Sequence, residues 1–260
     1  MDLDGVRLEV DDRVATITLA RPDRRNALGL EMLQNLTKVL ESVPEGCGVV
    51  VLAAEGTAFS AGHDLGEMID RSDDYFTELF DTCVRMMETI HAIPQPVIAK
   101  VQGIATAAGC QLVASCDLAI AADTARFATP GVSIGLFCST PMVPVSRAVG
   151  HKRAMQMLLT GEPISAEQAV EWGLINEAVP ADRLDEKVAA LADKILRFSS
   201  HTIATGKRAY YAQTGLPEGE AYSVVAPVMA GNAAAPDAQE GMSAFLEKRP
   251  PVWSDRDPGS

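Results

Sequence analysis

Short apolar runs alternate with helical periodicity along the first two-thirds of the chain. Residues 49–52 and 97–99 are continuously apolar, and they predict buried strands. Residues 6–20 predict two short strands on either side of Asp11 and Asp12. Strands that alternate with helices are typical of an α/β protein.

Apolar residues also recur at helical spacing. Leu33, Leu36 and Leu40 predict an amphipathic helix over residues 30–42. Residues 165–168 have the form of a capping box, which marks the start of another short helix. Helices are also expected near residues 74–92, 108–116 and 140–160.

The strand signal ends at Pro180, and the pattern that follows is helical. We therefore predict an α/β core over residues 1–180 and a C-terminal helical portion over residues 181–253. Residues 254–260 are polar with a Pro-Gly pair near their end, and they predict a disordered tail. The helical pattern starts with Leu184, Val188, Leu191, Ile195 and Leu196.

The composition, 47% hydrophobic and 22% charged, is that of an ordinary soluble globular protein. No signal segment opens the chain and no run approaches the roughly 18 apolar residues of a membrane span, so we expect no membrane association. A formal charge of −13 argues against nucleic-acid binding. A phosphorylated ligand would need a local basic patch, for which the candidates are Arg24, Arg25, Lys248 and Arg249.

The 5 cysteines form no CxxC pair, which favours a reducing environment and predicts a cytoplasmic protein. The 4 histidines are scattered without the spacing of metal ligands, so no metal is expected.

Two stretches carry candidate chemistry, residues 59–65 and 102–110. Each follows an apolar strand and passes through small residues toward a helix start. Small residues let a ligand approach the backbone, and free N–H groups at a helix N-terminus stabilise an anion. Two such turns aimed at one point would form an oxyanion hole.

The order of motifs strengthens this hypothesis. They are Arg21-Pro22, Asn26-Ala27-Leu28, Phe59-Ser60-Ala61-Gly62-His63-Asp64-Leu65, Val97-Ile98-Ala99-Lys100-Val101-Gln102-Gly103, Cys116-Asp117-Leu118-Ala119-Ile120-Ala121, Leu159-Thr160-Gly161-Glu162-Pro163-Ile164-Ser165-Ala166 and Trp172-Gly173-Leu174-Ile175-Asn176-Glu177-Ala178-Val179-Pro180. Over residues 5–250 the chain resembles the crotonase superfamily, the enoyl-CoA hydratase/isomerase family. The resemblance implies a spiral of ββα units with a helical C-terminal trimerisation portion, assembled as a homotrimer or homohexamer. It also implies an acyl-CoA thioester as substrate, so that CoA is part of the substrate and no separate cofactor is needed.

The same resemblance assigns roles to residues. The main-chain amides of His63 and Ala108 would polarise the thioester carbonyl, so the imidazole of His63 need not take part. Asp64 is expected to be a helix cap or turn partner rather than a base. Positions expected to contact the substrate or its CoA are Arg24, Arg25, Ala27, Ser60, Ala61, Gly62, Asp64, Leu65, Gly109 and Lys248.

Two acids of the family pattern are absent. Enoyl-CoA hydratases of the family use two glutamates, at the positions where this chain has Gln111 and Gly131. Glutamine does not accept a proton at neutral pH, and glycine has no side chain. The pattern therefore predicts little ordinary hydration, and it weakens simple isomerisation through the second position.

The loop at residues 134–141 is similar to that of the enoyl-CoA hydratase domain-containing proteins. Cys138 takes the position of an active-site aspartate in naphthoate synthases, and Ser139 that of the aspartate in dienoyl-CoA isomerases and chlorobenzoyl-CoA dehalogenases. Neither residue is a carboxylate. A buried thiol such as Cys138 is usually a packing residue.

Alternatives remain open at this point. The chain is an enzyme of fatty acid metabolism, in the lyase or isomerase class, or a non-catalytic acyl-CoA-binding subunit, or a decarboxylase or isomerase that needs mainly the oxyanion hole. Residues 131–135 also match the G-x-S-x-G elbow of hydrolases, but no apolar strand directly precedes Ser133. Its possible triad partners are Asp182, Asp185, Asp193 and His201.

Overall fold

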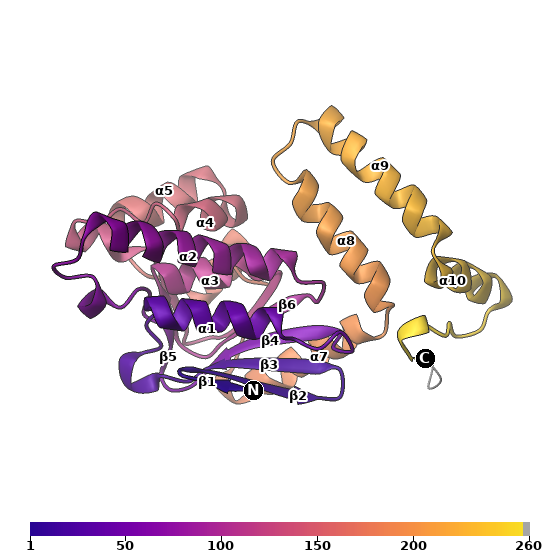
Figure 1. Ribbon diagram of the computed structural model, residues 1–260, viewed down its shortest axis with the longest axis horizontal. Coiled ribbons are helices and arrows are strands. Elements are labelled where there is room, and N and C mark those ends of the chain that lie inside the picture. The colour runs from indigo at the N-terminus through magenta and orange to yellow at the C-terminus, as the bar shows by residue number, and fades with distance from the viewer. Residues whose placement is uncertain (257–260) are drawn as a thin grey trace.

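The apolar runs of the sequence form a seven-stranded sheet in the computed structural model, which describes residues 1–256 (Figure 1). The strand order is β1-β2-β3-β4-β6-β8-β11. The first three strands are antiparallel, and each neighbouring pair from β3 to β11 is parallel. The strands are β1 (Asp2–Leu3), β2 (Val6–Asp11), β3 (Val14–Leu19), β4 (Val49–Ala54), β6 (Val97–Val101), β8 (Leu118–Ala122) and β11 (Glu177–Val179).

Both faces of the central strands are covered by helices, which explains why these strands are apolar throughout. Side chains alternate between the two faces. Val50 and Leu52 join the core beneath α1 (Leu30–Glu41), α2 (Asp73–Ala92) and α3 (Ala108–Ser115). Val49 and Val51 pack against α7 (Leu184–Leu196) on the opposite face. The α/β class and the two buried strands predicted from the sequence are confirmed.

A second, four-stranded sheet has the order β10-β9-β7-β5. Its strands are β5 (Ala58–Ser60), β7 (Ile104–Thr106), β9 (Arg126–Ala128) and β10 (Ile164–Ser165). β5, β7 and β9 run parallel, so their carboxyl ends meet at one edge. The two turns with candidate chemistry follow β5 and β7 and are thereby brought together.

The remaining helices agree with the sequence pattern, with one break. Residues 140–160 form two helices rather than one, because Gly150 has a φ of 79° between them. Ser165 and Gln168 form the predicted capping box. These helices are α4 (Met142–Val149), α5 (His151–Thr160) and α6 (Ala166–Trp172), and the short 3-10 helices are η1 (Pro22–Arg24), η2 (Leu65–Glu67), η3 (Pro130–Ile134) and η4 (Ala181–Arg183).

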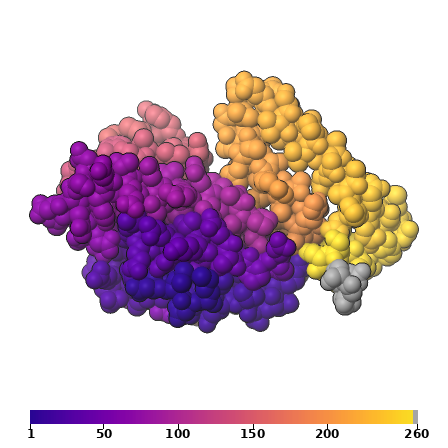
Figure 2. Space-filling model, in the orientation of Figure 1, coloured from indigo at the N-terminus to yellow at the C-terminus, as the bar shows by residue number. Residues whose placement is uncertain are grey.

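Helices α8 (Ser200–Gln213), α9 (Glu218–Ala234) and α10 (Pro236–Glu247) form an arm that projects from the core (Figures 1 and 2). No residue of α8 or α9 is fully buried. The predicted disordered tail begins too early, because Ser254–Arg256 form the 3-10 helix η5 and Asp255 pairs with Arg13. The rest of that tail, residues 257–260, lies outside the described residues. No helix of residues 1–256 is long and apolar enough to cross a membrane.

Candidate functional site

The first turn is fixed by a buried asparagine. The Asn26 amide nitrogen donates to the carbonyls of Glu55 and Ala58, both at 2.9 Å, on the two sides of the loop that leads into β5. The Ser60 hydroxyl donates to the Asn26 carbonyl at 2.9 Å and accepts from the Gly62 amide at 3.2 Å. Ser60 therefore orients the backbone of the turn, and its side chain is not free to contact a ligand.

The second turn contains a residue in an unusual conformation. Ala107 has φ 50° and ψ −118°, outside the regions that alanine normally occupies. Its amide donates to the Ala128 carbonyl at 2.9 Å, which ties the turn to the end of β9. Ala108 follows as the first residue of α3, where an amide has no acceptor within the helix. Strained residues held this way cluster at functional sites.

Two glycines allow the turns to meet. Gly62 has φ +87°, and a Cβ placed on it would lie 2.9 Å from the Cβ of Ala107 and 3.2 Å from the amide nitrogen of Ala108. A Cβ on Gly109 would lie 2.8 Å from the Cβ of Ser60. The amides of His63 and Ala108 donate to no acceptor within residues 1–256. A ligand oxygen is the group that can satisfy two such neighbouring donors.

The imidazole of His63 lies between the turn and α2. Its Nδ1 is 3.0 Å from the carbonyl of Leu28, so Nδ1 carries the proton. The ring meets Phe80 edge-on at 5.3 Å, and Nε2 is buried without a partner in the described chain. Burial lowers the pKa of His63, against the opposing effect of the Leu28 hydrogen bond. This histidine is neutral at pH 7.

Gln111, at the first glutamate position, is buried in α3. Its Oε1 accepts a weak hydrogen bond from the thiol of Cys83, with the two atoms 3.9 Å apart. Burial raises the pKa of Cys83 to about 12, so this thiol keeps its proton. The pair is neutral and has no proton acceptor of the strength that hydration needs.

Gly131, at the second glutamate position, is crowded by the loop that follows. A Cβ on Gly131 would lie under 3.0 Å from the carbonyl oxygen of Leu136 and 2.9 Å from Sγ of Cys138. Real Cβ atoms do not come so close, so the loop backbone fills the space where a side chain would begin. The glutamate is absent, and the loop occupies the space that its side chain would need.

Cys138 and Ser139 supply no substitute acid. Cys138 is buried, and burial raises the pKa of its thiol while the main-chain N–H of Gly131 opposes the shift. Burial also raises the pKa of the neighbouring Cys110 to about 12. Ser139 is exposed, and its hydroxyl donates to the Phe137 carbonyl at 3.3 Å. The two glutamate positions and the residues beside them therefore provide no charged side chain.

A pocket of about 550 Å³ opens beside the first turn. Its walls include four of the predicted ligand positions, which are Arg24, Ala27, Asp64 and Leu65, together with His63 of the predicted oxyanion hole. Asp64 caps η2 by accepting from the Gly66 amide at 3.0 Å, and its other oxygen is 3.3 Å from the Arg24 guanidinium. This pair leaves Arg24 more than half exposed at the pocket rim.

Three further positions that were predicted to contact the substrate or its CoA do not line this pocket. The Ala61 amide donates to the Arg25 carbonyl at 3.0 Å, so both residues act through the backbone of the first turn. Lys248 lies at the end of α10 in the projecting arm, and within one protomer it does not line this pocket. Its assignment to the CoA site is not supported by the geometry of a single chain.

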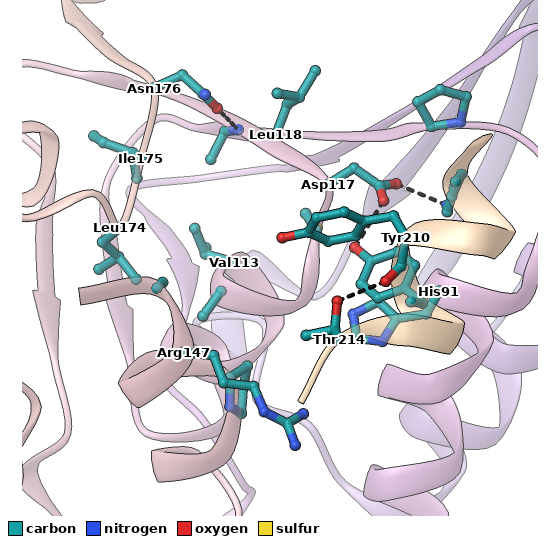
Figure 3. A pocket seen from close by; sticks show the side chains of 18 of the residues that line it. His91, Val113, Asp117, Leu118, Arg147, Leu174, Ile175, Asn176, Tyr210 and Thr214 are labelled. Carbon is teal, nitrogen blue, oxygen red and sulfur yellow. Dashed lines mark hydrogen bonds and ion pairs between the residues drawn. The ribbon is translucent and has the colours of Figure 1, made fainter. Parts of the chain in front are cut away.

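A larger cavity of about 700 Å³ separates the core from α8 (Figure 3). Lys207 donates to Asp117 and to two main-chain carbonyls, and the Tyr211 hydroxyl donates to Asp117 at 2.8 Å. His91 stacks on Tyr211 at 3.9 Å and is bonded to the carbonyl of Ser115. Burial lowers the pKa of Lys207, and Asp117 opposes the shift. These groups are occupied in fastening α8 to the core, so we place the functional site at the two turns instead.

The hydrolase alternative is wrong. Ser133 lies within η3 rather than at a strand-to-helix elbow, and its hydroxyl donates to the Pro130 carbonyl at 2.7 Å. Asp185, one possible partner, pairs with Lys100 at 2.7 Å.

The sequence did not single out three residues that shape the site. Asn26 was recognised only as part of a motif, although a buried asparagine often bonds main-chain groups. The conformation of Ala107 has no signal in the sequence, because alanine rarely adopts it. Thr129 is fully buried, and its hydroxyl has no partner in the described chain.

Residues 9–256 match the family model described as enoyl-CoA hydratase/isomerase, and the chain belongs to this family. Enoyl-CoA hydratase domain-containing protein 3, mitochondrial, of Rattus norvegicus is 48% identical over 246 residues, which cover 94% of this chain and 82% of that protein. The Homo sapiens protein of the same name is 47% identical, with coverages of 94% and 81%. A probable enoyl-CoA hydratase of Rhodobacter capsulatus is 35% identical, covering 98% of this chain and all of that one.

Solved structures agree. The enoyl-CoA hydratase of Mycobacterium smegmatis superposes with a TM-score of 0.94 at 47% identity, covering 96% of this chain and 98% of that one. The structure of human enoyl-CoA hydratase domain-containing protein 3 superposes with a TM-score of 0.91 at 45% identity, covering 96% of this chain and 100% of that one. The predicted crotonase-type fold and the resemblance to the domain-containing proteins are confirmed. Family membership supports an enzyme of the crotonase superfamily.

The predicted cytoplasmic location is contradicted, because the rat and human relatives are both named as mitochondrial. Free cysteines indicate a reducing environment, and they do not distinguish one reducing compartment from another.

Proposed function

We propose that the chain binds an acyl-CoA thioester and polarises its carbonyl between the amides of His63 and Ala108. The observation that carries this proposal is the meeting of two turns, each of which contains an amide without an acceptor in the described chain. Ala108 is fully buried, and a low-dielectric site screens such a donor little. One oxyanion-hole donor typically contributes about 3–4 kcal/mol to the stabilisation of a transition state.

The CoA portion is expected in the 550 Å³ pocket, where Arg24 offers a cation to a phosphate. The remaining charge of Arg24 is partly offset by Asp64, so this contact contributes modestly to affinity. Because the family relationship and the pocket both bear on CoA, binding is the best supported part of the function.

The reaction itself is one that an oxyanion hole can promote without two carboxylates. Gln111 and the crowded Gly131 argue against ordinary hydration of crotonyl-CoA. Each missing acid or base typically lowers a rate by about 10²–10⁴. A lyase or isomerase reaction through an enolate fits these residues, and a non-catalytic acyl-CoA-binding subunit is the second candidate.

Vibrational spectroscopy tests the proposal without knowledge of the reaction. Butyryl-CoA labelled with ¹³C at the thioester carbonyl should bind, and its carbonyl stretch should move to lower frequency on the protein. The thioether analogue, which lacks the carbonyl, should bind more weakly. An unshifted stretch in the bound thioester would contradict polarisation, whereas turnover of an enoyl-, dienoyl- or malonyl-CoA panel would separate the enzyme from the non-catalytic subunit.

The projecting arm points to assembly as a homotrimer or homohexamer. Helix α9 has no buried residue, and large apolar side chains of the arm are exposed, among them Tyr222, Met229, Phe245 and Leu246. An exposed apolar surface of this kind is typical of an interface. Sedimentation equilibrium should give three or six times the protomer mass, and a monomer at micromolar concentration would reject the assembly.

A further inference from the structure

A long segment beside the second turn has no charge. Residues 127–146 contain no Asp, Glu, Lys, Arg or His, although 22% of the chain is charged and its net charge is −13. Exposed charged residues normally interrupt a surface of this length. The segment nevertheless exposes large apolar side chains, and we name these together the apolar loop patch: Val132, Ile134, Leu136, Phe137, Met142 and Val143.

The patch is continuous with the candidate site. The segment begins at β9, where the Ala128 carbonyl accepts from the Ala107 amide at 2.9 Å. It passes Gly131, whose carbonyl accepts from the Leu136 amide at 2.9 Å, and then turns back through the buried Cys138. The acyl group is covalently joined to the carbonyl that the two amides would hold. The segment starts at the second turn, and a thioester held by the two amides would place its acyl group beside that start.

Both serine hydroxyls of the loop are hydrogen-bonded to main-chain carbonyls of the loop itself. The hydroxyl of Ser133 donates to the Pro130 carbonyl at 2.7 Å, and that of Ser139 donates to the Phe137 carbonyl at 3.3 Å. With these groups occupied, the patch presents mainly carbon to a ligand. No cation of residues 127–146 is available to pair with a carboxylate on the acyl group.

Building on the proposed function, we infer that the apolar loop patch binds the acyl chain, and that the substrate carries a long apolar chain rather than a short or carboxylated one. A second copy of the chain is the competing occupant. The arm of α8–α10 already offers separate apolar side chains to other copies, whereas the patch belongs to the segment that is hydrogen-bonded to the second turn. The acyl chain is therefore the better fit.

A chain-length series tests this inference. Dissociation constants of butyryl-, octanoyl- and dodecanoyl-CoA should be measured by calorimetry below their critical micelle concentrations, with succinyl-CoA as the carboxylated probe. Each buried methylene should tighten binding by up to about fourfold, so dodecanoyl-CoA should bind at least about 100-fold more tightly than butyryl-CoA. Succinyl-CoA should bind no better than butyryl-CoA.

Paired variants assign the effect to the patch. In the double variant Leu136→Ser, Phe137→Ser, the dissociation constant of dodecanoyl-CoA should rise by a factor at least about tenfold larger than that of butyryl-CoA. The control Val10→Ser, at a similarly exposed valine on β2, should leave the series unchanged.

Three outcomes overturn the inference. One is a flat series in a parent that still binds butyryl-CoA. Another is a double variant whose dissociation constants still depend on chain length as in the parent, but whose sedimentation differs from that of the parent. The patch would then be an interface between copies of the chain. The third is failure to bind any thioester, butyryl-CoA included, and only this outcome removes the proposed function as well.

Discussion

Gly131→Ala is the smallest change that tests whether the loop has closed the second glutamate position. The added Cβ would meet the Leu136 carbonyl oxygen under 3.0 Å and Cys138 Sγ at 2.9 Å. One contact is with backbone, which cannot rotate away as a side-chain end can. Overpacking of this kind typically costs about 1–3 kcal/mol. We expect the melting temperature to fall by roughly 2–12 °C for a chain of this size.

Two other glycines separate crowding from backbone conformation. Gly46 has no atom within 4 Å of its hypothetical Cβ, so Gly46→Ala should melt with the parent. Gly135 is equally open but has φ +79°, so Gly135→Ala should cost about 1 kcal/mol through the left-handed conformation alone. Gly131 is not among the residues with positive φ.

Calorimetric melts of the three variants at equal protomer concentration provide the assay. The reasoning fails if Gly131→Ala melts with Gly46→Ala, because the loop would then yield to a side chain at little cost. It also fails if Gly131→Ala loses stability but binds short thioesters more tightly. The position of the loop against Gly131 would then not be the one that the thioester-binding protein adopts.

The remaining predictions concern the two glutamate positions, the partly buried Lys207–Asp117 ion pair and the dependence of stability on pH. Gln111→Glu should fold, but adding Gly131→Glu should destabilise the protein and yield little crotonyl-CoA hydration, measured by absorbance; rapid turnover would contradict the crowding. Lys207→Met should cost about 1.5–3 kcal/mol in urea unfolding, because it removes the charged donor of Asp117, which keeps hydrogen bonds only from Tyr211 and the Val97 amide. Adding Asp117→Asn should recover part of that loss. Because burial lowers the pKa of His63, the unfolded chain binds its proton more strongly, so the free energy of unfolding should fall as pH drops below about 6.5. His63→Gln should weaken that fall between pH 7 and 5.

Local patterns predicted most of the fold. Apolar runs gave β4 and β6, helical spacing gave α1 and α2, and the capping box gave the start of α6. Each depends on residues close together in the chain. The break at Gly150 was missed because a glycine inside a periodic pattern can either continue a helix or end one.

The site was predictable where its groups belong to the backbone of a motif. The turns that contain His63 and Ala108 follow the parallel strands β5 and β7, so the sheet brings these turns together whatever their side chains are, and the oxyanion role of the two amides stays a prediction. The crowding at Gly131 was not predictable, because it comes from the path of a loop whose backbone conformation has no simple signal. The Asp117–Lys207 pair joins α8 to the start of β8, and no periodicity links residues so far apart.

The hydrogen bonds of Asn26 determine which substitutions this part of the sequence can accept. Its side chain bonds the main chain of Arg21, Glu55 and Ala58, and it recognises none of their side chains. In a saturation-mutagenesis library, the partly exposed position 55 should therefore tolerate changes that keep its backbone path, while position 26 should accept almost nothing. The pattern of tolerated substitutions would then separate positions that contribute only main-chain groups from position 26, whose side chain binds those groups.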